Sequence, residues 1–139
     1  AIVQQVVMAE SLVAAMPITA PAPAVPFDAE SLARQPLILY PARPRPSYAD
    51  NVLALFANHG LSVRVTQWTN ELQTAIGLVA AGLGVALVPA SVQQQHRADI
   101  GYARLTDAEA VSPIILSQRR GDVSAPLQRC LQLIGANLP

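Results

Sequence analysis

The 139 residues suffice for one domain, or for two small lobes that share a core. Nine arginines, with no lysine, balance nine acidic residues, so we expect no basic face that could hold a nucleic-acid backbone. The single cysteine, Cys130, excludes an internal disulfide and a cysteine zinc site, and it fits a cytosolic protein. The longest apolar stretch, residues 75–90, is interrupted by three glycines and a proline, so it does not predict a membrane span.

Strands and helices are expected to alternate from the first residues onward. Residues 5–17 are dense in valine, leucine and methionine and favour a buried, extended segment, although the alanine and methionine content would also suit a helix. The proline-rich residues 18–35 predict a surface connection in which Asp28 begins a short helical turn. Residues 36–40, PLILY, predict a short buried strand.

The clearest helix of the sequence begins at Ser47. Ser47 has the properties of an N-cap, and Asp50 stands three residues later, at the spacing of a capping box. Gly60 predicts the left-handed C-terminal stop. One helical face carries Val52, Leu55, Phe56 and His59. We expect the imidazole of His59, in the last turn, to contact the free carbonyl groups there.

The second half of the chain continues the alternation. Its expected elements are a half-exposed strand over 61–68, a helix over 71–81 capped by Asn70 and ended by Gly82, a buried strand over 84–89, a short helix over 90–97, strands over 100–105 and 112–118, and a helix over 125–137 capped by Ser124. The last helix places Leu127, Cys130, Leu131 and Ile134 on its apolar face. Cys130 is therefore expected in a core. The order predicts an α/β fold built from right-handed βαβ units with a mostly parallel sheet.

No group of residues in the sequence has the spacing of a catalytic or metal site. His59 and His96 lack serine, aspartate or cysteine at distances typical of a triad or a metal clamp. The segment GLGVALVP follows a helix and precedes a strand, the reverse of the order in a phosphate-binding loop. The sequence therefore predicts a binding protein, with no enzyme activity, no cofactor and no metal.

The candidate binding site is the loop YPARPRPSYADN, residues 40–51. Its prolines stiffen the chain between a strand and a helix, and Arg43 and Arg45 add positive potential. The free amides of residues 47–50 lie at a helix N-terminus beyond the carboxyl end of a strand, a place that attracts carboxylate or phosphate. Asp50 counts against such a site because its charge already occupies part of the dipole. The alternative is a solvated turn that only orients the next helix.

Ala49 is expected as the second residue of that helix, with its backbone N–H directed into the site. On this basis Ala49→Asp is expected to leave the helix as stable as before or more stable, while its charge repels an anionic ligand.

Two segments resemble a known family. ELQTAIGLVAAGLGVALVPAS, residues 71–91, resembles the hallmark segment of the effector-binding domain of LysR-type transcriptional regulators. LILYPARPRPSYADNVLALFANHGL, residues 37–61, is similar to the subgroup that controls catechol, chlorocatechol and benzoate breakdown and responds to cis,cis-muconate or chloromuconates.

The resemblance implies Rossmann-like lobes of the type 2 periplasmic-binding-protein fold, in a partial domain. Residues 1–10 would be a remnant of lobe I with the first crossover, residues 11–110 lobe II, and residues 111–139 the second crossover and a C-terminal helix that returns to lobe I. The start of the first lobe and the DNA-binding helix-turn-helix are expected outside this sequence.

The resemblance also implies site residues and partners. One wall of a site for a small dicarboxylate would be formed by Pro46, Ser47, Tyr48 and Ala49. Effector domains of the family pair as homodimers or homotetramers, here through Arg64, Trp68, Glu71 and Leu72. The protein would be cytoplasmic and contact no membrane. Two alternatives stay open, a lobe of a periplasmic solute-binding protein for a small carboxylate and an enzyme on a similar scaffold.

Overall fold

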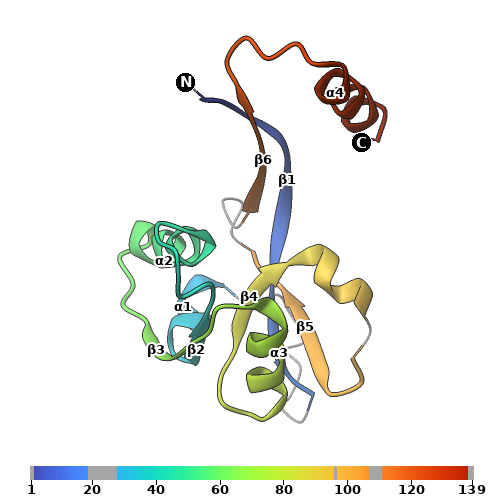
Figure 1. Ribbon diagram of the computed structural model, residues 1–139. Coiled ribbons are helices and arrows are strands. Elements are labelled where there is room, and N and C mark those ends of the chain that lie inside the picture. The colour runs from blue at the N-terminus through green and yellow to red at the C-terminus, as the bar shows by residue number, and fades with distance from the viewer. Residues whose placement is uncertain (1, 19–27, 96, 107–110, 138–139) are drawn as a thin grey trace. The chain divides into compact units, whose positions relative to one another are not determined.

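The computed structural model describes residues 2–18, 28–95, 97–106 and 111–137 (Figure 1). The chain divides into two compact units, which are Ser11–Ser112 and the two segments Ala1–Glu10 and Pro113–Pro139 taken together. The strands are β1 (Ile2–Pro17), β2 (Pro36–Leu39), β3 (Arg64–Trp68), β4 (Ala86–Pro89), β5 (Ile100–Arg104) and β6 (Val111–Arg119). The helices are α1 (Ala29–Ala33), α2 (Tyr48–Asn58), α3 (Leu72–Ala80), the 3₁₀ helix η1 (Ala90–Gln95) and α4 (Ala125–Asn137).

The strands of the larger unit combine parallel and antiparallel pairs. β2 and β3 are parallel, with α2 as their connection. The end of β1 lies antiparallel between β4 and β5. A parallel bridge between Leu37 and Val85 joins the two sheets, and the N–H of Ile38 donates to the Val85 carbonyl at 2.8 Å. The prediction of a mostly parallel sheet was therefore wrong at β1, because that strand enters before the first helix and is not placed by a βαβ crossover.

Two apolar clusters cover the two faces of these strands. Alternate residues of β1, β2 and β4 point to opposite faces, as the period of a strand requires. One face packs against α1 and α2 through Leu32, Ala49, Val52, Leu55 and Phe56. The other face packs against α3 and η1 through Ala75, Ile76, Val79 and Val92. The larger unit is thus a three-layer α/β structure, as the alternation of elements predicts.

Most of the expected element types in this unit are confirmed. The capping box of Ser47 and Asp50 is present, and Gly60 and Gly82 have φ values of 68° and 82° at the helix ends. The Nδ1 atom of His59 lies 2.8 Å from the carbonyl oxygen of Leu55, as expected for a histidine in a last turn.

Three details differ from the sequence-based expectations. The N-cap of α3 is Glu71 rather than Asn70. Residues 90–95 form a 3₁₀ helix. Among the side chains of β1 whose burial is described, those of residues 12–16 are buried next to β4 and β5, whereas those of residues 2, 4, 5, 9 and 11 are exposed. His96 lies outside the described residues.

The smaller unit contains the first part of β1, most of β6 and α4. β6 pairs with β1. On α4, Leu127, Leu131 and Ile134 are half-buried, whereas the side chain of Cys130 is exposed. The prediction that Cys130 is a core residue was wrong, because helical spacing shows which residues share a face but not whether another element covers it. Among the described residues, no helix has the length and apolar character needed to cross a bilayer.

Candidate ligand-binding site

The loop between β2 and α2 is attached along the end of β3. The N–H of Thr69 donates to the carbonyl of Leu39 at 3.0 Å, and the N–H of Ala42 donates to the carbonyl of Thr69 at 2.7 Å. The N–H of Arg43 donates to Oδ1 of Asn70 at 3.2 Å. This bond explains why Asn70 does not cap α3, since its side-chain oxygen serves the loop instead. The loop is thus held by bonds to residues 27 or more positions away.

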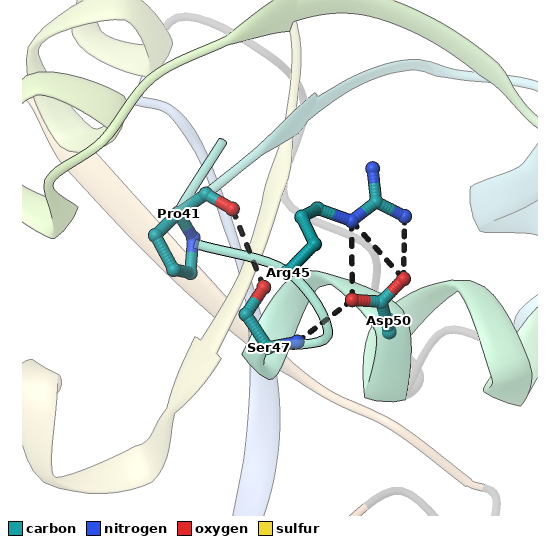
Figure 2. Close-up of polar contacts among 4 residues, drawn as sticks. All are labelled: Pro41, Arg45, Ser47 and Asp50. Atoms are coloured by element: carbon teal, nitrogen blue, oxygen red, sulfur yellow. Dashed lines mark hydrogen bonds and ion pairs between the residues drawn. The ribbon is translucent and has the colours of Figure 1, made fainter. Parts of the chain in front are cut away.

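The N-terminus of α2 is closed by an internal carboxylate. The backbone N–H of Ser47 donates to Oδ2 of Asp50 at 2.7 Å (Figure 2). The Ser47 hydroxyl faces back along the loop and lies 3.4 Å from the carbonyl oxygen of Pro41. Ser47 is half-buried. Its two hydrogen bonds restrain both the start of α2 and the chain before it.

Arg45 and Asp50 form a forked ion pair beside Ser47. The Nε atom of Arg45 lies 3.1 Å from each carboxylate oxygen of Asp50, and Nη2 also contacts Oδ1 (Figure 2). The hydrogen bond from Arg45 is the main cause that lowers the pKa of Asp50, followed by the Ser47 N–H. Asp50 in turn raises the pKa of Arg45.

This pair changes the predicted electrostatics of the site. The sequence suggests that Arg45 adds free positive potential and that Asp50 opposes an anion. In the structure the two charges compensate each other. Arg45 is paired with Asp50 and adds no free positive potential, and Asp50 leaves no uncompensated negative charge at the helix N-terminus. The side chain of Arg43 is exposed.

Tyr48 connects α2 to β4. Its hydroxyl donates to the carbonyl of Leu87 at 2.7 Å, and its ring centroid lies 5.1 Å from that of Tyr40, with an interplanar angle of 34°. Burial raises the pKa of Tyr40 to about 12, so this phenol stays neutral. Tyr40 was not among the residues predicted to form the site. Its position directly after β2, at the carboxyl end of a parallel strand, was the available signal.

Ala49 does not expose its side chain at the site. The residue is 0% exposed and belongs to the core cluster beneath α2. Its N–H is one of the first-turn amides that precede any acceptor within the helix. The expectation that Ala49→Asp preserves stability was wrong, because the carboxylate would enter the core.

The predicted pairing residues lie mostly on the surface. Arg64, Trp68 and Glu71 are exposed, and Leu72 is half-buried against the cluster under α3. Trp68 therefore does not fold into the core.

The groups at the candidate site can make non-covalent contacts with a ligand. They are amide and hydroxyl donors, aromatic rings and a compensated ion pair. Within the described ranges, no three or more His, Cys, Asp and Glu side chains lie where they could hold a metal ion together.

Comparison with known proteins relates this geometry to a family. Residues 1–139 match the LysR substrate binding domain family. The chain is 64% identical over 134 residues to the HTH-type transcriptional regulator CatR of Pseudomonas putida, covering 96% of this chain and 46% of CatR. The BenM effector binding domain with its effector benzoate superposes with a TM-score of 0.88 at 30% identity, over 98% of this chain and 63% of that chain. Full-length CbnR complexed with its target DNA superposes with a TM-score of 0.89 at 26% identity, over 97% of this chain and 48% of the CbnR chain.

The chain spans about half the length of the curated relatives it matches. These relatives are transcriptional regulators and not enzymes. The matched structures confirm the α/β, type 2 periplasmic-binding-protein-like fold. Its curated relatives include the HTH-type transcriptional regulators CatR and BenM. The chain therefore belongs to the LysR substrate binding domain family.

Proposed function

We propose that this chain is part of the effector-binding domain of a cytoplasmic LysR-type regulator of aromatic-compound breakdown. Its ligand would be a muconate-like dicarboxylate, cis,cis-muconate or a chloromuconate. One carboxylate would lie at the N-terminus of α2, against Pro46, Ser47 and Tyr48 and the N–H of Ala49. The observation that carries the proposal is the capped start of α2 directly beyond the parallel strand β2.

The local chemistry supports a carboxylate at this place. First-turn amides and the helix dipole favour an anion. The Arg45–Asp50 pair removes the repulsion that a lone Asp50 would exert. Because the hydroxyl of Tyr48 is committed to Leu87, Tyr48 would offer its ring to the carbon chain of the ligand.

Benzoate is a second candidate ligand. It shares the carboxylate of muconate, and the BenM domain that superposes on this chain is described with benzoate as its effector. The two candidates differ in whether a second carboxylate must be bound, and binding measurements with both ligands distinguish them.

The test places a charge at Ser47 instead of at the buried Ala49. Ser47→Asp and Ser47→Asn both provide a good N-cap, so α2 should form in each variant. Only aspartate adds a negative charge where a carboxylate would lie. At about 4 Å and an effective dielectric near 20, the repulsion is on the order of 4 kcal/mol before screening. A quarter of that would weaken binding roughly fivefold.

We therefore expect cis,cis-muconate to bind Ser47→Asp at least about fivefold more weakly than Ser47→Asn, measured by titration calorimetry on the intact gene product that contains this chain. Equal dissociation constants would show that the loop is only a turn. Tighter binding of benzoate than of muconate by the parent protein would select the second candidate.

We further propose that two copies pair through β3 and α3, at Arg64, Trp68, Glu71 and Leu72. Exposed aromatic side chains are enriched at interfaces, and Trp68 is exposed on β3. DNA would be contacted by a helix-turn-helix outside this chain, in agreement with the zero net charge of these residues.

A disulfide test examines this pairing. In a Cys130→Ser background, which removes the exposed natural thiol, Gln73→Cys on the exposed side of α3 should yield cross-linked dimers on oxidation of the intact gene product. Cysteine at exposed Glu30 on α1 is the matched control, for which monomers are expected. Monomers from both variants would rule out pairing through α3.

A further inference from the structure

The guanidinium of Arg45 is held on a second side by an aromatic ring. Its Cζ atom lies 4.7 Å from the ring centroid of Trp68 on β3. Trp68 is the single tryptophan of the chain and is 39% exposed. A guanidinium at this distance over an indole face is attracted by the electron density of the ring.

The two contacts of Arg45 join two different elements. Asp50 holds Nε and Nη2 as a fork and also accepts the N–H of Ser47. Trp68 holds the same guanidinium from β3. The start of α2 is therefore linked to β3 through Asp50, Arg45 and Trp68, a set of three residues that we term the Arg45 clamp.

The clamp complements the backbone bonds of the loop. Those bonds attach Ala42 and Arg43 to the residues that follow β3. The Arg45 clamp attaches the far end of the loop, directly before Pro46 and Ser47. Arg45 lies beside the proposed carboxylate position, but its hydrogen bonds are directed to Asp50 rather than outward.

We propose that Arg45 is a positioning residue for the effector site, and that the Arg45 clamp couples the occupancy of this site to Trp68 on β3. This inference rests on the proposed function, since it assigns how the same site is oriented. A carboxylate bound at the start of α2 lies beside Asp50, which the Ser47 N–H and Arg45 hold in place, so its charge acts on Asp50 and through it on Arg45. Any shift of Arg45 changes the surroundings of the indole. Ligand binding thereby changes the surroundings of Trp68 on β3, the strand proposed to pair with a second copy.

The test uses Arg45→Lys, Trp68→Leu and the double variant in the intact gene product that contains this chain. Lysine keeps the charge but cannot form the fork or stack as a plane. Each single variant is expected to bind cis,cis-muconate about three- to tenfold more weakly than the parent, as measured by titration calorimetry. The double variant should bind cis,cis-muconate with the same affinity as the single variant that binds it less tightly, because both changes break the same clamp. Trp68→Phe, which keeps an aromatic face, should recover part of the affinity.

Arg97→Lys is the matched control. Arg97 forms a comparable fork with Asp99, at 2.9 and 2.8 Å, with side chains 39% and 51% exposed against 41% and 32% for Arg45 and Asp50. The control should bind muconate like the parent. Because all these groups are exposed in part, the thermal midpoint should change little in any variant. A loss of affinity at an unchanged midpoint therefore does not result from a loss of stability.

A second readout is the emission of Trp68. In residues 1–139, indole emission should shift between the parent and Arg45→Lys and stay unchanged in Arg97→Lys. Muconate binding by the parent with unchanged affinity in Arg45→Lys and Trp68→Leu overturns this inference alone. Strictly additive losses in the double variant also overturn it. A parent protein that does not bind muconate overturns the proposed function, and the inference with it.

Discussion

Ala49→Asp is expected to unfold the protein or to lower its free energy of unfolding by about 3–5 kcal/mol. The side chain of Ala49 is 0% exposed and lies among core residues that include Val52 and Phe56. A carboxylate at this position would lose its hydration, and adding a carboxyl group to a close-packed interior forces the neighbouring side chains to shift. The favourable interaction of aspartate with the helix dipole, at most about 1 kcal/mol, is much smaller than this cost.

Ala54→Asp is the matched control for this prediction. Ala54 lies on the exposed side of the same helix, so the same substitution should cost only the lower helix propensity of aspartate, less than about 1 kcal/mol. Urea titrations followed by far-ultraviolet circular dichroism on residues 1–139 measure both variants. Similar midpoints for Ala49→Asp and Ala54→Asp would contradict the buried position of Ala49.

Gly84→Ala is expected to lower the free energy of unfolding by about 2–3 kcal/mol. A Cβ atom at Gly84 would lie 2.7 Å from the carbonyl oxygen of Pro36 and 3.2 Å from Cγ1 of Ile38. The Pro36 carbonyl also accepts the N–H of Val85 at 2.9 Å, one of the bonds that join β2 to the strand segment before β4. Relief of the clash would therefore stretch that junction, since the contacting atom belongs to the backbone.

Gly77→Ala provides the control. Gly77 lies within α3, and a Cβ atom there would meet nothing within 4 Å. The gain in helix propensity predicts unchanged or raised stability, by up to about 1 kcal/mol. Thermal unfolding of both variants gives the comparison. A loss in Gly77→Ala as large as that in Gly84→Ala would show that the close approach to β2 is not the cause.

Local signals predicted the helix at the site because its start and end are encoded within a few residues. Ser47 and Asp50 form a capping box through one turn of chain, and Gly60 supplies a left-handed residue at the point where the helix ends. The alternation of half-buried and exposed residues over 61–66, which leads into β3, is equally local. The resemblance of residues 71–91 and 37–61 to the family likewise depends on contiguous residues, and the family match confirms it.

The partners of individual side chains could not be read from such local patterns. Asn70 has the sequence properties of a helix cap, but its oxygen accepts the N–H of Arg43, 27 residues earlier in the chain. Nothing in the spacing of Arg45 and Trp68 indicates that they stack. Each contact depends on the three-dimensional path of the loop along β3.

The amino-acid sequence alone was sufficient for the element types, the α/β class, the family and the stretch of chain in which a ligand site is proposed, because each rests on short-range spacing or contiguous residues. Folding in three dimensions was needed to establish that β1 enters antiparallel, that Ala49 points into the core and that the charge of Arg45 is balanced by Asp50. The physical reason is that burial and compensation of charge depend on which distant elements pack over a residue, and helical or strand periodicity carries no information about those neighbours.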